Sequence, residues 1–123
     1  MNNDKFSFEE LIVWQKSVEY ATRVMHVVDK IETDRRHYRI IENCESAAVS
    51  IASNIAEGNG RHSTKEYIHF LYIARGSLYE SVTQLIIFFK SAWISEADLH
   101  ELKMLATEIA KMISSLINAH QKR

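Results

Sequence analysis

Residues 50–64 read SIASNIAEGNGRHST, and this stretch holds the end of one helix, a turn and the start of another helix. Gly58 can adopt the left-handed backbone conformation that ends a helix, and the Asn-Gly pair after it tolerates positive φ. Ser63 and Glu66 fit a capping box, in which each side chain satisfies a free backbone N–H of the other residue. The stretch therefore predicts two helices joined by a tight turn.

The same helix-start pattern occurs at Ser7 (SFEE) and at Ser95 (SEAD), while the remaining helix can begin at Thr33 or Asp34. In each of the four segments, apolar residues recur at spacings of three and four, which predicts one buried stripe per helix. The four stripes are Leu11, Trp14, Val18, Ala21, Met25 and Val28; Ile41, Cys44, Ala48, Ile51 and Ile55; Tyr67, Phe70, Ala74, Leu78, Leu85 and Phe88; and Leu99, Leu102, Ala106, Ile109, Ile113 and Leu116.

Composition favours a helical protein. The 123 residues suit one domain spanning 1–123, and 46% of them are hydrophobic, with no proline and three glycines. Short connections between long helices make sequential helices antiparallel neighbours. The sequence predicts an all-α fold, an up-down-up-down antiparallel four-helix bundle.

A second set of apolar residues lies outside these stripes on the first and third helices. Large exposed apolar patches are unusual on soluble monomers, so we expect this set to form the interface of a homo-oligomer. The alternative is that the same side chains widen one intramolecular core. The set comprises Val13, Tyr20, Val24, Val27 and Ile31 on the first helix, and Val82, Ile86, Phe89 and Trp93 on the third.

Small residues predict a close pairing of the second and third helices. Ala48, Ala52 and Ala56 recur every four residues, and the third helix offers Ala74, Gly76, Ser77 and Ser81. A glycine within a helix costs about 1 kcal/mol relative to alanine, so Gly76 needs a packing reason. The polar pair Asn54 and Glu57 lies beside this seam and needs partners, which Arg61, Arg75 or a neighbouring subunit could supply.

Charge limits nucleic-acid binding to a local patch. The formal net charge is −1, so the chain lacks the excess of basic residues that binding phosphate over its whole surface requires. The densest basic run holds Arg35, Arg36 and Arg39, with acidic residues nearby. It is either a solvated helix start or, together with Arg61, a patch that contacts nucleic-acid phosphates.

No catalytic, cofactor or metal motif is evident. The chain has one cysteine, Cys44, in an apolar helical pattern, and no nucleophile elbow or glycine-rich phosphate loop. A di-metal bundle needs two inward Glu-x-x-His motifs, whereas Glu66 and His69 form one that lies off the core stripe. We expect a non-enzymatic protein without cofactor, metal or small-molecule substrate. The absence of a long apolar run predicts a cytoplasmic location without membrane insertion.

Several segments together resemble a known family. They are FEELIVWQ at 8–15, NIAEG at 54–58, Gly60 and Arg61, Ser63, and FLYIARGSLYE at 70–80. In this combination and order they resemble the 23S rRNA intervening-sequence proteins, which are small bacterial four-helix-bundle proteins. The resemblance implies a ring-like homopentamer without catalytic residues or an established biochemical activity.

The resemblance also implies a class of partner. The accessory variability protein of diversity-generating retroelements is a similar pentamer that associates with a reverse transcriptase and nucleic acid, so RNA or an RNA-handling protein is the expected partner. The alternative is a protein-assembly unit without nucleic-acid contact, which fits Glu45 and Ser46 at positions where family members carry basic residues. The family-signature residues, which we assign to helix pairing and subunit contact, are Asn54, Glu57, Gly58, Arg61, Arg75, Gly76, Ser77 and Glu80.

Overall fold

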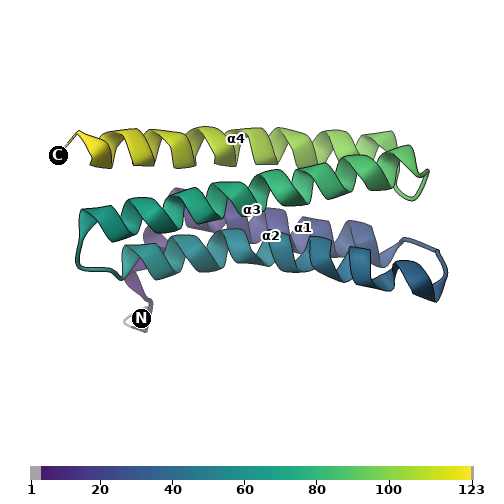
Figure 1. The fold of residues 1–123 in the computed structure, drawn as a ribbon, viewed down its shortest axis with the longest axis horizontal. Coiled ribbons are helices and arrows are strands. Elements are labelled where there is room, and N and C mark those ends of the chain that lie inside the picture. The colour runs from purple at the N-terminus through teal and green to yellow at the C-terminus, as the bar shows by residue number, and fades with distance from the viewer. Residues whose placement is uncertain (1–3, 123) are drawn as a thin grey trace.

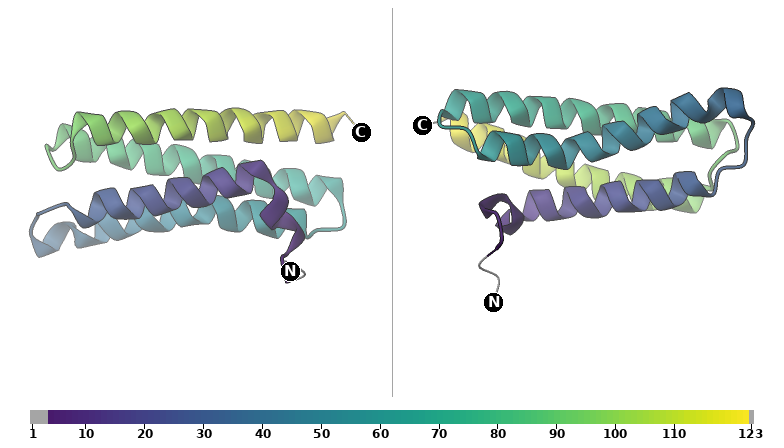
Figure 2. Two further views of the ribbon diagram at one scale, coloured as in Figure 1. Left: turned by 180° about the vertical axis from the view of Figure 1, so that it is seen from behind. Right: turned by 90° about the horizontal axis from the view of Figure 1, so that it is seen from below.

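The computed structural model describes residues 4–122, and within them the chain forms four long antiparallel helices (Figures 1 and 2). The predicted all-α, up-down-up-down four-helix bundle is confirmed, and each helix packs against its neighbours in the chain while α1 also packs against α4. The elements are the 3₁₀ turn η1 (Ser7–Glu10), α1 (Ile12–Asp29), the 3₁₀ turn η2 (Arg35–His37), α2 (Tyr38–Asn59), α3 (Thr64–Lys90) and α4 (Glu96–Gln121).

Two of the three predicted serine caps are confirmed. Ser63 Oγ accepts the backbone N–H of Glu66 at 3.1 Å, and Ser95 Oγ accepts that of Asp98 at 3.1 Å. The prediction for Ser7 is wrong, because the Glu9 carboxylate instead accepts the N–H of Phe6 at 2.9 Å and stabilises η1 ahead of α1. The first α-helix therefore begins at Ile12, five residues after Ser7.

The turn after α2 differs from the prediction in its backbone. Gly58 lies inside α2, and no glycine has a positive φ in the part of the chain that the structure describes. Positive φ occurs instead at Ala92, with φ 63°, between α3 and α4. There the N–H groups of Ala92 and Trp93 donate to the carbonyls of Phe89 and Phe88 at 2.9 Å each, which ends α3 with a hydrogen-bonded left-handed residue.

On α1 the core includes the stripe that was expected at an oligomer interface, together with Ala21 and Val28 of the predicted core stripe. Val13, Tyr20, Val24 and Val27, expected at an oligomer interface, are buried in the core of the protomer. The exposed side of α1 carries Val18 and Met25 instead, two residues expected in the core. The prediction of an interface at these four residues is therefore wrong, and the alternative of a wider intramolecular core is correct for α1.

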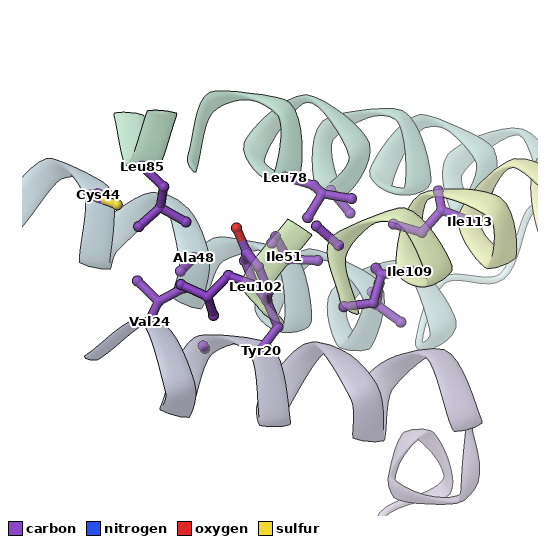
Figure 3. Close-up of a cluster of buried hydrophobic side chains, with 14 of the residues drawn as sticks. Tyr20, Val24, Cys44, Ala48, Ile51, Leu78, Leu85, Leu102, Ile109 and Ile113 are labelled. Atoms are coloured by element: carbon purple, nitrogen blue, oxygen red, sulfur yellow. The ribbon is translucent and has the colours of Figure 1, made fainter. Parts of the chain in front are cut away.

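Hydrogen bonds explain how this stripe can be buried although it contains polar groups. Tyr20 Oη and Ser81 Oγ lie 2.8 Å apart, and the Tyr20 hydroxyl points from α1 into the bundle (Figure 3). Ser81 also donates to the carbonyl of Leu78 at 2.9 Å, and Ser17 donates to that of Val13 at 2.7 Å. Because each buried hydroxyl has a partner, its desolvation cost is offset and the stripe can face inward.

The helix seams differ in character. Ion pairs at the surface join α1 to α4, whereas α2 and α3 are joined by close packing. The three cations of these pairs recur every seven residues along α1 and its C-cap residue Lys30, so all three lie on the side that faces α4. The ion pairs are Lys16 with Glu108 at 3.3 Å, Arg23 with Glu101, and Lys30 with Asp98 at 2.9 Å.

Candidate functional site

The family-signature glycine of α2 lies at a close approach of α2 and α3. A Cβ atom added to Gly58 would lie 2.8 Å from Cβ of Phe70, 3.0 Å from Cδ1 of Tyr67 and 3.3 Å from the carbonyl oxygen of Tyr67. The first of these distances is shorter than carbon atoms tolerate without a shift of the structure. Gly58 is therefore required by close packing, and its assignment to helix pairing agrees with the structure.

Asn54 finds its partners within the protomer. Its side-chain nitrogen donates to the carbonyl oxygen and to the hydroxyl of Ser50, at 2.8 Å each. The hydroxyl of Ser77 on α3 donates to the same Ser50 hydroxyl at 3.1 Å. This three-residue polar chain spans the α2–α3 seam, so Asn54 does not need a neighbouring subunit to satisfy it.

The signature arginines are held by their own protomer. Arg61 pairs with Glu57 at 2.6 Å, and its guanidinium lies 4.8 Å from the centre of the Phe70 ring. Arg75 donates to Ser114 of α4 at 3.0 Å. Its guanidinium lies 5.0 Å from the centre of the Tyr72 ring. Glu80 is exposed on α3. The subunit-contact role of these residues remains a prediction.

Gly76 does not belong to the α2–α3 seam. It is exposed, and a Cβ atom added there would meet nothing within 4 Å. Its predicted role in helix pairing is therefore wrong. Ala52 and Ala56 likewise lie beside α1, where they line a groove between α1 and α2. Of the small residues assigned to this pairing, Ala48 and Ala74 are buried in the bundle core.

The predicted interface stripe of α3 also packs against the protomer's own core. Its members Val82, Ile86, Phe89 and Trp93 are partly buried there. The Trp93 ring lies 5.4 Å from the ring of Phe88. The side of α3 that points away from the bundle is a different one, so these four residues do not form the free apolar face that the sequence suggested.

An apolar groove runs between α1 and α2. It measures about 420 Å³ and contains large exposed side chains, with Val18 37%, Met25 43% and Val49 45% accessible. Sequence reasoning missed it because Val18 and Met25 were assigned to the core. Its lining residues are Phe8, Trp14, Val18, Ala21, Thr22, Met25, Val49, Ala52, Ser53 and Ala56.

The candidate nucleic-acid residues do not form one patch. Arg35, Arg36 and Arg39 lie where η2 leads into α2, whereas Arg61 lies beyond the other end of α2. The 22 residues of α2 span about 33 Å at 1.5 Å per residue. Arg36 pairs with Asp34 at 3.1 Å and Arg61 with Glu57, which leaves Arg35 and Arg39 as exposed cations at the first end.

Burial raises the pKa values of two titratable groups in the core. Desolvation raises the pKa of the Cys44 thiol to about 12, with further contributions from the charges of Glu45 and Glu80. Burial also raises the pKa of Tyr20 above its usual range. A nucleophilic cysteine needs the opposite shift. Within residues 4–122, no group of three His, Cys, Asp or Glu side chains could hold a metal ion.

No helix among the described residues is both long and apolar enough to cross a bilayer.

Comparisons with known proteins agree with this picture. A crystal structure of a protein of unknown function from the S23 ribosomal protein family of Bacteroides thetaiotaomicron has the same fold, with a TM-score of 0.80 and 24% sequence identity over 86% of this chain and 98% of that chain. A search of curated proteins gave no match. The sequence profile described as 23S rRNA-intervening sequence protein matches residues 9–115. This match covers most of the four-helix bundle, and the chain therefore belongs to the 23S rRNA-intervening sequence protein family.

Proposed function

We propose that this chain is a cytoplasmic, non-enzymatic scaffold protein that acts as a homo-oligomer, a pentamer as its family resemblance implies. The observation that carries the proposal is the open apolar groove between α1 and α2, with Val18, Met25 and Val49 exposed on its walls. Burying these side chains against another protein surface is favourable at about 25 cal/mol per Å² of apolar area. A scaffold needs such a surface and no reactive group.

The oligomeric state tests this proposal directly. Light scattering coupled to size exclusion, or native mass spectrometry, separates the 14.3 kDa monomer from a pentamer of about 72 kDa. Dilution from high to low micromolar concentrations gives the dissociation constant. A wild-type protein that remains monomeric at all these concentrations refutes the self-assembling scaffold, and the groove must then receive a different protein.

RNA binding is a second candidate, carried by the exposed arginines at the start of α2. Arg35, Arg36 and Arg39 lie within about one helical turn, and a ring with all copies pointing the same way gathers five such clusters on one rim. A labelled structured RNA, titrated by fluorescence anisotropy at several salt concentrations, tests it. Three phosphate contacts per bound site weaken affinity about 20- to 40-fold between 50 and 200 mM salt.

The matched control for RNA binding is the triple variant in which Arg35, Arg36 and Arg39 become glutamine. All three side chains are exposed, so the substitution leaves the core intact. If the variant binds RNA more weakly and its remaining affinity depends less on salt concentration, the cluster contacts RNA phosphates. Absence of binding by the wild-type protein at low salt contradicts RNA binding and leaves the protein scaffold.

A further inference from the structure

Gly76 has no structural reason within its own protomer. It lies in the interior of α3 (Thr64–Lys90), is exposed, and has no atom within 4 Å of an added Cβ. Its φ is not positive, so no turn requires a glycine either. An unnecessary glycine in a helix costs about 1 kcal/mol relative to alanine. The missing Cβ becomes useful where a second helix crosses this surface closely.

The residues around Gly76 suit such a crossing. On the side of α3 that points away from the bundle, Tyr72 is 44% accessible, Tyr79 54% and Ile87 51%. Their spacing along the helix, together with that of Thr83, places them on one side with Gly76. We call Tyr72, Gly76, Tyr79, Thr83 and Ile87 the outer face of α3. Aromatic residues such as these two tyrosines are enriched at the centre of protein interfaces.

The α1–α2 groove offers an apolar hollow and, at one end, a group of acidic side chains. At the loop end of the groove lie Asp29, Glu42 and Glu45, and the pKa of Glu45 is raised by burial and by repulsion from the other two carboxylates. No ion pair in the described part of the chain neutralises this acidic cluster. A cation supplied from outside the protomer would relieve the repulsion.

The outer face of α3 ends in such a cation. Lys90 is exposed at the last position of α3 and takes part in none of the ion pairs among residues 4–122. It lies at the same end of the bundle as the acidic cluster, since the ring of His37 is 4.9 Å from that of Trp93, just beyond α3 (Figure 1). Copies arranged around an axis parallel to the bundle keep the same end up, so Lys90 of one copy lies level with the acidic cluster of the next.

We propose that the outer face of α3 in one copy docks into the α1–α2 groove of a second copy, with Lys90 against Asp29, Glu42 and Glu45. This inference rests on the proposed homo-oligomeric function and specifies how its subunits join. The two surfaces differ, so the contact is head-to-tail, and the joined pair keeps one free groove on one copy and one free outer face on the other. Repeated contacts of this kind close into a ring when the rotation between copies allows it.

An interface of ordinary size would occupy a modest share of the surface of this chain. Each partner in a stable complex buries about 800 Å², roughly a tenth of the 7793 Å² accessible surface of this chain. The 27 residues of α3 extend about 40 Å, which is long enough to cover the groove and to reach the acidic cluster. The grouping of exposed tyrosines, isoleucine and valine on these two surfaces provides an apolar centre, while the charges lie at one edge.

Complementation between two assembly-defective variants tests the head-to-tail contact. Gly76→Gln with Ile87→Glu blocks the outer face, and Met25→Glu with Val49→Glu blocks the groove; all four positions are exposed, so both proteins are expected to fold. Each variant alone should be monomeric, with a dissociation constant raised about 100-fold or more. Mixed in equal amounts, they retain one intact contact and should form a 1:1 dimer of about 29 kDa, twice the 14.3 kDa chain mass.

A charge exchange tests the register of the two surfaces. Lys90→Glu and Glu45→Lys should each weaken assembly about 5- to 20-fold at low salt, and the double variant should regain most of the wild-type affinity. Met104→Glu is the matched control, because Met104 is 62% accessible on α4, outside both surfaces. Its native mass should equal that of the wild-type protein.

The outcomes separate this inference from the proposed function. A monomeric wild-type protein refutes both. An oligomeric wild type that the outer-face and groove variants leave intact refutes the contact while the scaffold proposal stands. The contact is also refuted if the outer-face variant is monomeric while the groove variant still assembles, because the outer face then pairs with itself. Two monomeric variants that fail to form a dimer when mixed refute the contact as well. Circular dichroism confirms that each variant is folded.

Discussion

Replacing Gly58 with alanine is expected to destabilise the bundle by about 1–2 kcal/mol. The new Cβ would lie 2.8 Å from Cβ of Phe70 and 3.0 Å from the ring of Tyr67, so α3 must move away from α2 or both side chains must shift. Overpacking of this kind typically costs about 1–3 kcal/mol. Alanine recovers up to about 1 kcal/mol of glycine's helix penalty, but Gly58 lies in the last turn of α2, where that gain is reduced.

Urea denaturation followed by circular dichroism measures this difference in the free energy of unfolding. In thermal unfolding, the same difference should lower the melting temperature by about 3–8 °C. Gly60→Ala and Gly76→Ala are matched controls, since an added Cβ meets no atom closer than 3.7 Å at Gly60 and none within 4 Å at Gly76. All three substitutions should be measured in the monomeric groove variant, so that assembly does not contribute to stability. Gly76→Ala should then stabilise the protein by about 1 kcal/mol. If Gly58→Ala is as stable as its parent, the close approach of α2 and α3 at this point is wrong.

Three further predictions concern the turn between α3 and α4 and two buried residues of the core. Ala92→Gly should stabilise the protein by about 1 kcal/mol in urea denaturation, because Ala92 has φ 63° and glycine adopts that conformation without strain; a loss of stability contradicts this. Tyr20→Phe should cost about 1 kcal/mol in the same assay, since it removes the 2.8 Å hydrogen bond to Ser81, while Tyr72→Phe at an exposed site should change little. The Cys44 thiol should resist Ellman's reagent at pH 8 until the protein unfolds. Because burial raises its pKa from 9.0 to about 12, the unfolded chain loses this proton first, and stability should fall as pH rises from about 9; rapid labelling of the native protein contradicts the burial.

The sequence was sufficient to predict the architecture because local signals agree with one another. The starts of α3 and α4 follow from Ser63 and Ser95, whose hydroxyls accept hydrogen bonds within their own first turns. Such contacts involve residues three apart and do not depend on the tertiary fold. The absence of proline and the short connections then favour an antiparallel bundle.

The orientation of α1 could not be decided in this way, because two stripes on that helix satisfy the same spacing. The structure buries the stripe with Tyr20 and Ser17, and what permits this is the partner that Ser81 supplies from α3, 61 residues away. The spacing of apolar residues along one helix contains no information about such a long-range hydrogen bond. The positions of Ala52 and Gly76 depend on the rotation of α2 and α3 about their axes, which small residues alone leave undetermined. The groove between α1 and α2 was missed for the same reason.

The seam between α1 and α4 has a consequence for folding and for rearranging the chain. It joins the two helices most distant in sequence, so it must close after the local hairpins, and its exposed ion pairs contribute modestly. The start of α1 and the end of α4 share a groove, lined among others by Leu11 and Leu116, so these two helix ends lie at the same end of the bundle (Figure 1). A short peptide can therefore link them, and new ends can be opened in the α2–α3 turn. In such a circular permutant the α1–α4 contact becomes a local hairpin, while the tight α2–α3 contact becomes the last to close.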